Sequence, residues 1–218
     1  MKKTFRYTTS FLLGTGLVLL LFIGRVLYSQ SWFYGFLLWN LFLAFIPFCI
    51  SQYMLRKEDM GKIKWWLCLA TWLLFFPNAP YIVTDLVHLR LRNGVPLWYD
   101  AAMVFSAALT GLWIGCISLM QMEKLWRRQL PNIRARYFIA SVLLLSGFGI
   151  YLGRVLRFNS WDVVTDPFDL LKAIVQRVIF PWQYLRTWGV TILFAAIIWV
   201  AYQQVKNLVY DSASKHLK

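Results

Sequence analysis

The residue types most able to do chemistry gather in a short stretch that interrupts a long apolar run. Asp85 and His88 lie three residues apart in this stretch. Residues three apart share a helix face, so the Asp85 carboxylate can orient the His88 ring. Such a pair is suited to general-base catalysis, or it can supply two ligands of a metal ion that Asp100 or Asp162 would complete.

A second polar group follows the fifth apolar segment. Arg154 and Arg157 are also three residues apart, and Asn159 and Asp162 come soon after them. A planar guanidinium group binds phosphate or carboxylate through two parallel hydrogen bonds. Two such groups on one helix face predict a site for an anion.

Each of these groups also has a purely structural interpretation, which the sequence leaves open. The carboxylate–imidazole pair can neutralise Arg92 and Arg154 at the membrane rim, and Asp100 can start a helix. The two arginines after the fifth segment can extend to lipid headgroups, and the Asn159–Asp162 segment can cap a turn. The functional interpretation rests on the expected co-location of these residues, because ionisable groups at a membrane are costly to keep without a use.

Two prolines determine where the polar stretch begins. The apolar run from Trp65 to Phe76 covers about 18 Å of a hydrocarbon layer that is about 30 Å thick. Pro77 and Pro80 follow and have no N–H, so we expect the helix to break here and Ala79 to leave helical geometry. Carbonyl groups freed in lipid need a partner inside the protein, and Asn78 is the nearest one.

The residues after the break predict a second helix, which starts at Pro80 and ends at Asn93-Gly94. Discontinuous helices at membrane depth tend to line binding sites. Four polar residues of this helix recur at i, i+4, i+7 and i+11 and would form one stripe. They are Tyr81, Asp85, His88 and Arg92.

The whole chain reads as one integral-membrane domain, residues 1–218. It is 60% hydrophobic and 15% charged, and it contains 12 Trp, 11 Tyr and 17 Phe residues, which is typical of proteins anchored in headgroup belts. The net charge is +14, but the basic residues lie in short clusters between apolar runs, which argues against nucleic-acid binding. Each of the three cysteines lies in an apolar run, so we expect neither a disulfide framework nor a zinc site.

Six apolar segments are long enough to cross a bilayer, if the third includes its broken part. They predict an all-α polytopic bundle of about six transmembrane helices, with the third span broken at Pro77–Pro80. Small residues spaced by four in the fourth and fifth segments predict close helix packing there. The segments are 10–28, 32–55, 64–83, 98–122, 137–157 and 185–204.

The basic residues also predict the orientation. Fifteen of the 23 Lys and Arg residues fall at the termini and in the loops after the second and fourth segments. The positive-inside rule therefore places both termini in the cytoplasm. We expect the membrane to be a plasma membrane of the bacterial type. The first segment can also be read as a signal peptide cleaved near residue 31. We favour an uncleaved anchor, because the apolar run is long and the cleavage site lacks Ala.

One further helix is expected near residues 166–180, on the outer membrane surface. Asp166 is a helix N-cap residue, and Pro167 suits the first position of a helix. The apolar residues that follow share one face, which is typical of an amphipathic helix lying on lipid.

The sequence resembles a known family in three segments, namely FFPNAPYIVTDLVHL at 75–89, WYD at 98–100 and GRVLRFNSWD at 153–162. Together they are similar to the integral-membrane family of bacteria and archaea called domain of unknown function 1361. The resemblance covers nearly the whole chain and implies a small polytopic membrane protein, without implying a reaction, cofactor or partner. The shared positions that it implies are Pro77, Asn78, Pro80, Tyr81, Asp85, His88, Asp100, Arg154, Arg157, Asn159, Trp161 and Asp162.

Three functions are compatible with these patterns. The first is binding or transport of an anionic lipid headgroup or small anion at the outer rim. The second is an enzyme, a hydrolase or transferase, acting on a lipid-linked or envelope substrate, with His88 as base and Asp85 orienting it. The third is a structural assembly partner. The expected partners are membrane lipids. The binding residues expected for the first function are Asn78, Tyr81, Arg92, Asp100, Arg154, Arg157, Asn159 and Asp162.

Overall fold

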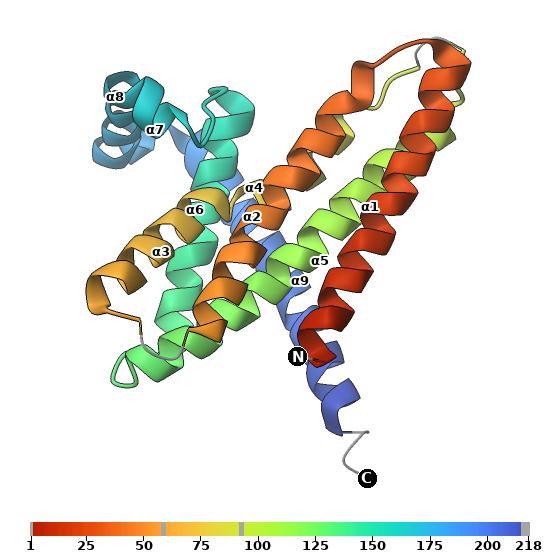
Figure 1. Ribbon diagram of the computed structural model, residues 1–218. Coiled ribbons are helices and arrows are strands. Elements are labelled where there is room, and N and C mark those ends of the chain that lie inside the picture. Colours follow the sequence, from red (N-terminus) through yellow and green to blue (C-terminus); the bar gives the residue numbers. More distant parts are fainter. Residues whose placement is uncertain (1, 58–59, 92–93, 215–218) are drawn as a thin grey trace.

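The computed structural model describes residues 2–57, 60–91 and 94–214. Six helical stretches in this described part are long and apolar enough to cross a membrane, and they form the helix bundle shown in Figure 1. The chain is a multi-pass membrane protein of the all-α class, as the sequence predicts. Their main helices are α1 (Lys2–Ser29), α2 (Phe36–Arg56), α3 (Lys62–Phe75), α5 (Leu97–Gln129), α6 (Ala135–Val155) and α9 (Leu185–Ser214). The third stretch reaches from Lys62 to His88, so it includes the shorter helices after α3.

Shorter helices connect them. Three are 3-10 turns: η1 (Phe33–Gly35), η2 (Ile82–His88) and η3 (Pro181–Gln183). The others are α4 (Asn78–Tyr81), α7 (Asp162–Thr165) and α8 (Pro167–Ile179). In Figure 1, α7 and α8 lie at the opposite end of the bundle from the two labelled chain ends. We call these the cavity end and the termini end.

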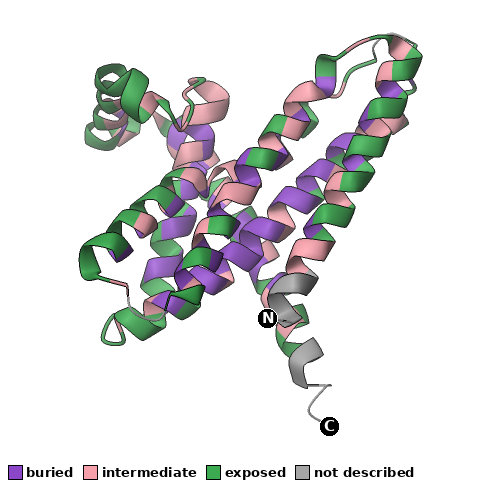
Figure 2. Ribbon diagram, in the orientation of Figure 1, coloured by how far each residue is buried: buried purple, intermediate pink, exposed green. Residues whose placement is uncertain are grey.

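Helix α5 is the centre of the bundle. It contacts α1, α2, α4, η2, α6 and α9, and buried residues follow it along most of its length (Figure 2). It has 33 residues and is therefore about 50 Å long, which exceeds the roughly 30 Å hydrocarbon core. A helix of this length crosses the membrane at a tilt or extends beyond it.

The third span is broken at Pro77–Pro80, as predicted, but the kind of break differs. We expected Ala79 to leave helical geometry, and this is wrong, because Ala79 lies inside α4. A proline keeps a helical φ, here −59° at Pro77, and removes only a donor. The chain replaces the lost bonds by a tighter turn, in which Ala79 N–H donates to Phe76 O at 3.1 Å.

The second helix also ends earlier than expected. It continues as the 3-10 helix η2 and stops at His88, where Leu89 takes an extended conformation. The predicted end at Asn93-Gly94 is therefore wrong. Arg92, the last member of the predicted stripe, lies outside the described residues. The hydroxyl of Thr84 donates to Tyr81 O at 2.6 Å, within this tighter turn.

Glycines on two helices hold the break from both sides. A Cβ at Gly115 of α5 would lie 2.8 Å from Ala79 Cβ, and one at Gly149 of α6 would lie 3.1 Å from Pro77 Cγ. Gly111 and Gly153 are placed in the same way against Ile82 and Tyr81. The small residues that predicted close packing therefore pack against the broken span.

Helix α8 is the amphipathic surface helix expected near 166–180. Pro167 is at its first position. Its apolar side chains Phe168, Leu171 and Val178 are exposed, as Figure 2 shows for most of the helix. Exposed apolar side chains of this kind are suited to contact with lipid.

Candidate functional site

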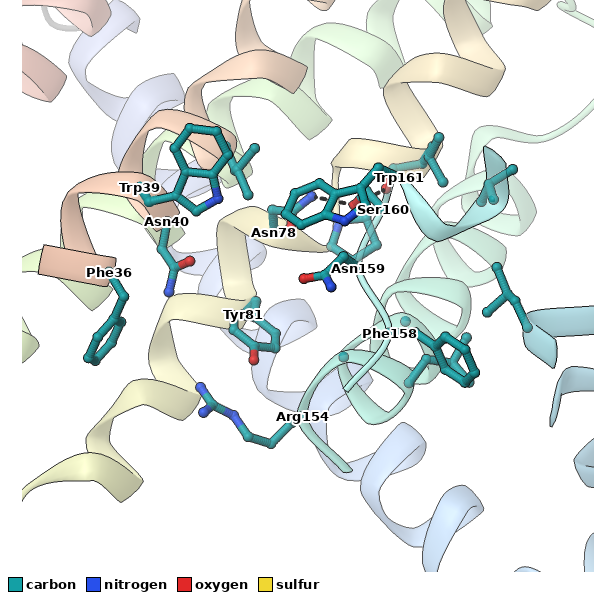
Figure 3. A pocket seen from close by; sticks show the side chains of 18 of the residues that line it. Phe36, Trp39, Asn40, Asn78, Tyr81, Arg154, Phe158, Asn159, Ser160 and Trp161 are labelled. Carbon is teal, nitrogen blue, oxygen red and sulfur yellow. Dashed lines mark hydrogen bonds between the residues drawn. The ribbon is translucent and has the colours of Figure 1, made fainter. Parts of the chain in front are cut away.

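A cavity of about 440 Å³ lies beside the break, at the cavity end. It is enclosed by α2, the broken span, the end of α6 and the segment that leads into α8 (Figure 3). Its polar lining residues include Asn40, Asn78, Tyr81, Asp85, His88, Arg154, Asn159 and Ser160. Its aromatic lining residues are Phe36, Trp39, Tyr81, Phe158 and Trp161, together with the His88 ring.

An ion pair between Asp85 and Arg154 lines this cavity. Asp85 is 1% exposed, and its second carboxylate oxygen accepts a hydrogen bond from Asn40 Nδ2 at 2.8 Å. Arg154 Nε donates to Thr84 Oγ1 at 2.8 Å. A buried charge is stable when it is paired and hydrogen-bonded, and both conditions are met here.

His88 contacts the same arginine. The distance between Arg154 Nη1 and His88 Nε2 is 2.7 Å. A guanidinium group only donates hydrogen bonds, so a hydrogen bond at this distance needs Nε2 as the acceptor, which is the tautomer with the ring proton on Nδ1. Arg154 therefore holds the lone pair that a general base at Nε2 would use. The guanidinium also stacks over the Tyr81 ring at 4.6 Å from its centroid.

Asn78 joins the break to the loop that follows α6. Ala79 N–H has moved to Phe76 O, which leaves Phe75 O without its usual helical donor. Asn78 Nδ2 donates to Phe75 O at 2.9 Å, so Asn78 is the partner of this freed carbonyl. The same nitrogen is 3.0 Å from Ser160 Oγ, and Figure 3 shows this contact across the cavity wall.

Asp100 lies in a different place from the residues above. It is in the first turn of α5, and its carboxylate accepts from Arg25 Nε at 2.7 Å and Arg25 Nη2 at 3.3 Å. Both side chains are buried. The Arg25 guanidinium also lies over the Tyr34 ring. Asp100 therefore pairs with α1, and Arg25 is an interior residue instead of a loop charge.

The second predicted arginine is also separated from the cavity residues. Helix α6 ends at Val155, and Arg157 is exposed with φ 66°, so the two guanidinium groups do not share a helix face. Asp162 accepts a hydrogen bond from Asn159 N at 2.6 Å and another from Thr165 Oγ1 at 3.1 Å. These bonds are the turn cap that the structural interpretation predicted. The Asn159 side chain lies in the cavity, near Tyr81 in Figure 3.

Sequence reasoning missed three residues that matter here. Asn40 is a single amide within an apolar segment, and that alone is a signal, because polar groups inside the membrane rarely lack a role. Arg25 carried the same signal as a charge near the end of the first segment. Thr84 lies inside the polar stretch, but nothing in the sequence indicates that its hydroxyl accepts a hydrogen bond from Arg154, 70 residues away.

The carboxylates and the histidine do not form a metal site. Within the described part of the chain, no three His, Cys, Asp or Glu side chains are grouped to hold a metal ion. Asp100 and Asp162, the further ligands considered from the sequence, are held by Arg25 and by the turn before α7.

Comparison with known proteins identifies the family. The model of the family described as "Protein of unknown function (DUF1361)" matches residues 39–201. Neither the curated proteins nor the solved structures that were compared with the chain gave a match. The matched region is more than half of the chain and contains the break, both glycine pairs and the Asp85–Arg154 ion pair. The chain belongs to the DUF1361 family.

Proposed function

We propose that the protein binds a membrane lipid by its anionic headgroup in the cavity beside the broken span. Arg154 carries this proposal. Among the described residues that line the cavity, it is the one with a permanent positive charge. Its side chain is 21% exposed, and one of the two hydrogens on Nη1 is left over after the contact with His88. A phosphate oxygen can accept that hydrogen.

The size of the cavity favours a lipid over a small anion. Its volume of about 440 Å³ lies in the range of pockets that enclose an organic ligand, and ligand pockets are mostly apolar with a few placed polar groups. Leu74, Leu152, Leu170 and Ile174 supply apolar walls. The last two belong to α8, the helix with an exposed apolar face. A lipid can therefore place its headgroup at Arg154 and its chains beside α8.

The packing of the break favours binding over transport. Ala79 has 0% exposure and packs against Gly111 and Gly115 of α5, while its neighbours Pro77 and Tyr81 pack against glycines of α6. Passage through the membrane would need this contact to open. An enzyme is less well supported than a binding protein, because Arg154 holds the His88 lone pair and Asn40 holds the second oxygen of Asp85.

We also propose that the cavity end faces the outside and the termini end faces the cytoplasm of a bacterial-type cell. In the sequence, fifteen basic residues fall at the termini and in the loops after the second and fourth segments, and eight fall elsewhere. Of those eight, Arg25 and Arg177 are buried and Arg154 is ion-paired. Fewer unpaired basic residues then remain in the loops of the cavity end. The excess of basic residues at the termini end is therefore larger than the count from the sequence indicates.

Photocrosslinking tests the lipid proposal. The full-length protein carries p-benzoylphenylalanine in place of Trp161, which lines the cavity, in vesicles of phosphatidylethanolamine and phosphatidylglycerol. After irradiation, mass spectrometry gives the lipid share of the adducts. We expect phosphatidylglycerol to exceed its share in the vesicle, because Arg154 is the one Lys or Arg side chain among the described lining residues and its guanidinium can donate to a phosphate oxygen.

The control carries the same probe in place of Trp98, a 70% exposed side chain at the cavity end but on α5. Adducts at this position should follow the vesicle composition. Equal lipid shares at the two positions would contradict selective headgroup binding in the cavity.

A further inference from the structure

A second cavity, of about 480 Å³, lies at the termini end of the bundle. It runs between the last turns of α5, the first turns of α6 and the facing part of α9. We call it the basal groove. It shares none of its lining residues with the cavity beside the break.

One carboxylate holds two cations in this groove. Glu123 accepts hydrogen bonds from Arg127 Nη2 at 2.7 Å and from Lys206 Nζ at 2.8 Å. It also accepts one from the Tyr202 hydroxyl. The Glu123 side chain is 7% exposed, while those of Arg127 and Lys206 are 62% and 23% exposed. The anion is therefore enclosed and the cations face outward.

A third cation completes the groove. Arg136 at the start of α6 stacks on Tyr137 and donates to its hydroxyl at 2.8 Å. Among the described lining residues, three cations thus stand against the single carboxylate of Glu123. This excess of positive charge is suited to a bound anion, and guanidinium groups bind phosphate through paired hydrogen bonds.

The rest of the groove is apolar and continues toward the middle of the membrane. Ala140 and Leu144 of α6 are exposed one and two turns beyond Arg136, and Trp199 of α9 is exposed about two turns before Lys206. A charged entrance above an apolar wall matches a molecule with a phosphate at one end and an acyl chain at the other. Basic pockets between transmembrane helices bind anionic lipid headgroups in this way.

We propose that the basal groove binds an anionic phospholipid of the membrane leaflet at the termini end. Its phosphate contacts Arg127, Arg136 and Lys206. One acyl chain lies along Ala140 and Trp199. This site is independent of the one beside the break, because different residues carry it.

Native mass spectrometry of the delipidated full-length protein tests this proposal. The protein is titrated with phosphatidylglycerol and, separately, with phosphatidylcholine of the same acyl chains. We expect tighter binding of phosphatidylglycerol. Arg136→Gln removes a phosphate contact without touching Glu123, and it should weaken phosphatidylglycerol binding about tenfold, as the loss of one charge-assisted hydrogen bond does.

Two further variants separate charge from the apolar wall. Arg128→Gln removes an exposed charge one residue from Arg127 and outside the groove, so binding should stay as in the wild type. Ala140→Trp fills the apolar part, leaves every charge in place, and should remove one bound lipid. Glycerol 3-phosphate, which has the phosphate but no chain, should bind much more weakly than the lipid.

Three results would overturn the proposal. They are equal binding of the two lipids by the wild type, equal binding of phosphatidylglycerol by the Arg136 and Arg128 variants, and binding of glycerol 3-phosphate as tight as that of the lipid. The last would mean a site for soluble phosphate esters. The crosslinking at Trp161 reports on the other cavity, so each proposal can fail without the other.

Discussion

Asp85 connects three parts of the chain at the scale of single residues. Its carboxylate accepts from Asn40 on α2 and from Arg154 on α6, while the residue itself lies on the broken span. Arg154 in turn contacts Thr84 and His88. Each of these polar groups is thus oriented by a neighbour from another helix, and this keeps Arg154 in one position for a ligand.

Neutralising this carboxylate should destabilise the protein. Asp85→Asn keeps the shape of the side chain but leaves the Arg154 guanidinium without a counter-charge. We expect the free energy of unfolding in detergent to fall by about 3 kcal/mol, the lower end of the range for breaking a buried ion pair, because Arg154 is partly exposed. Asp162→Asn is the matched control. Its turn can be capped by an amide as well, so the change should stay below about 0.5 kcal/mol. Equal effects of the two substitutions would contradict a special role for Asp85.

The broken third span is the feature that matters most at the scale of elements. It remains helical through both prolines and is held between glycines of α5 and α6. In lipid, where apolar burial does not drive association, close contact of this kind is the main source of helix packing. The broken span is closely packed, and it therefore forms a rigid wall of the cavity.

A methyl group added at one of these glycines should disturb the break. Gly115→Ala would place a Cβ 2.8 Å from Ala79 Cβ, and overpacking of this size costs about 1–3 kcal/mol. Gly16→Ala is the same substitution in α1, where a Cβ meets nothing within 4 Å. It should be neutral or stabilise the protein by up to about 1 kcal/mol. Thermal unfolding of both variants measures the difference, and a tolerated Gly115→Ala would show that the contact with α5 is dispensable.

The sequence was sufficient to locate the membrane spans and the break, but it did not predict which side chains contact each other. Hydropathy located the six spans, and the prolines located the break. Whether the backbone leaves helical geometry at Ala79 depends on a switch to i→i+3 bonds, which a count of missing donors does not reveal. The partner of Asp100 is 75 residues away, and only the packing of α1 on α5 selects it. Arg157 was predicted to share a helix face with Arg154. This was wrong because α6 ends at Val155, before Arg157 is reached.

The whole molecule has two chemically different ends. The cavity end carries a cavity with one paired arginine and the amphipathic α8, while the termini end carries the basal groove and most of the basic residues. Helix α5 connects them. The proposed orientation therefore assigns each lipid site to one leaflet, and it is open to direct measurement.

Cysteine labelling in intact cells measures this orientation. The native thiols Cys49, Cys68 and Cys116 are first replaced by Ala. Val164→Cys, at an 83% exposed position in α7, should react with a membrane-impermeant maleimide in intact cells. Ile133→Cys, at a 47% exposed position between α5 and α6, should react only after permeabilisation, because positive-inside charges surround it. The reverse pattern would invert the proposed topology.

The Arg25–Asp100 pair has a consequence for the order in which the protein is made. The arginine leaves the ribosome 75 residues before its carboxylate, a delay of about 4–15 s at 5–20 residues per second. During that time α1 has a cation near its end, and the carboxylate that pairs with it in the bundle has not been made. We therefore expect newly made α1 to wait with Arg25 at the headgroups, and to settle in the bundle only when the first turn of α5 arrives.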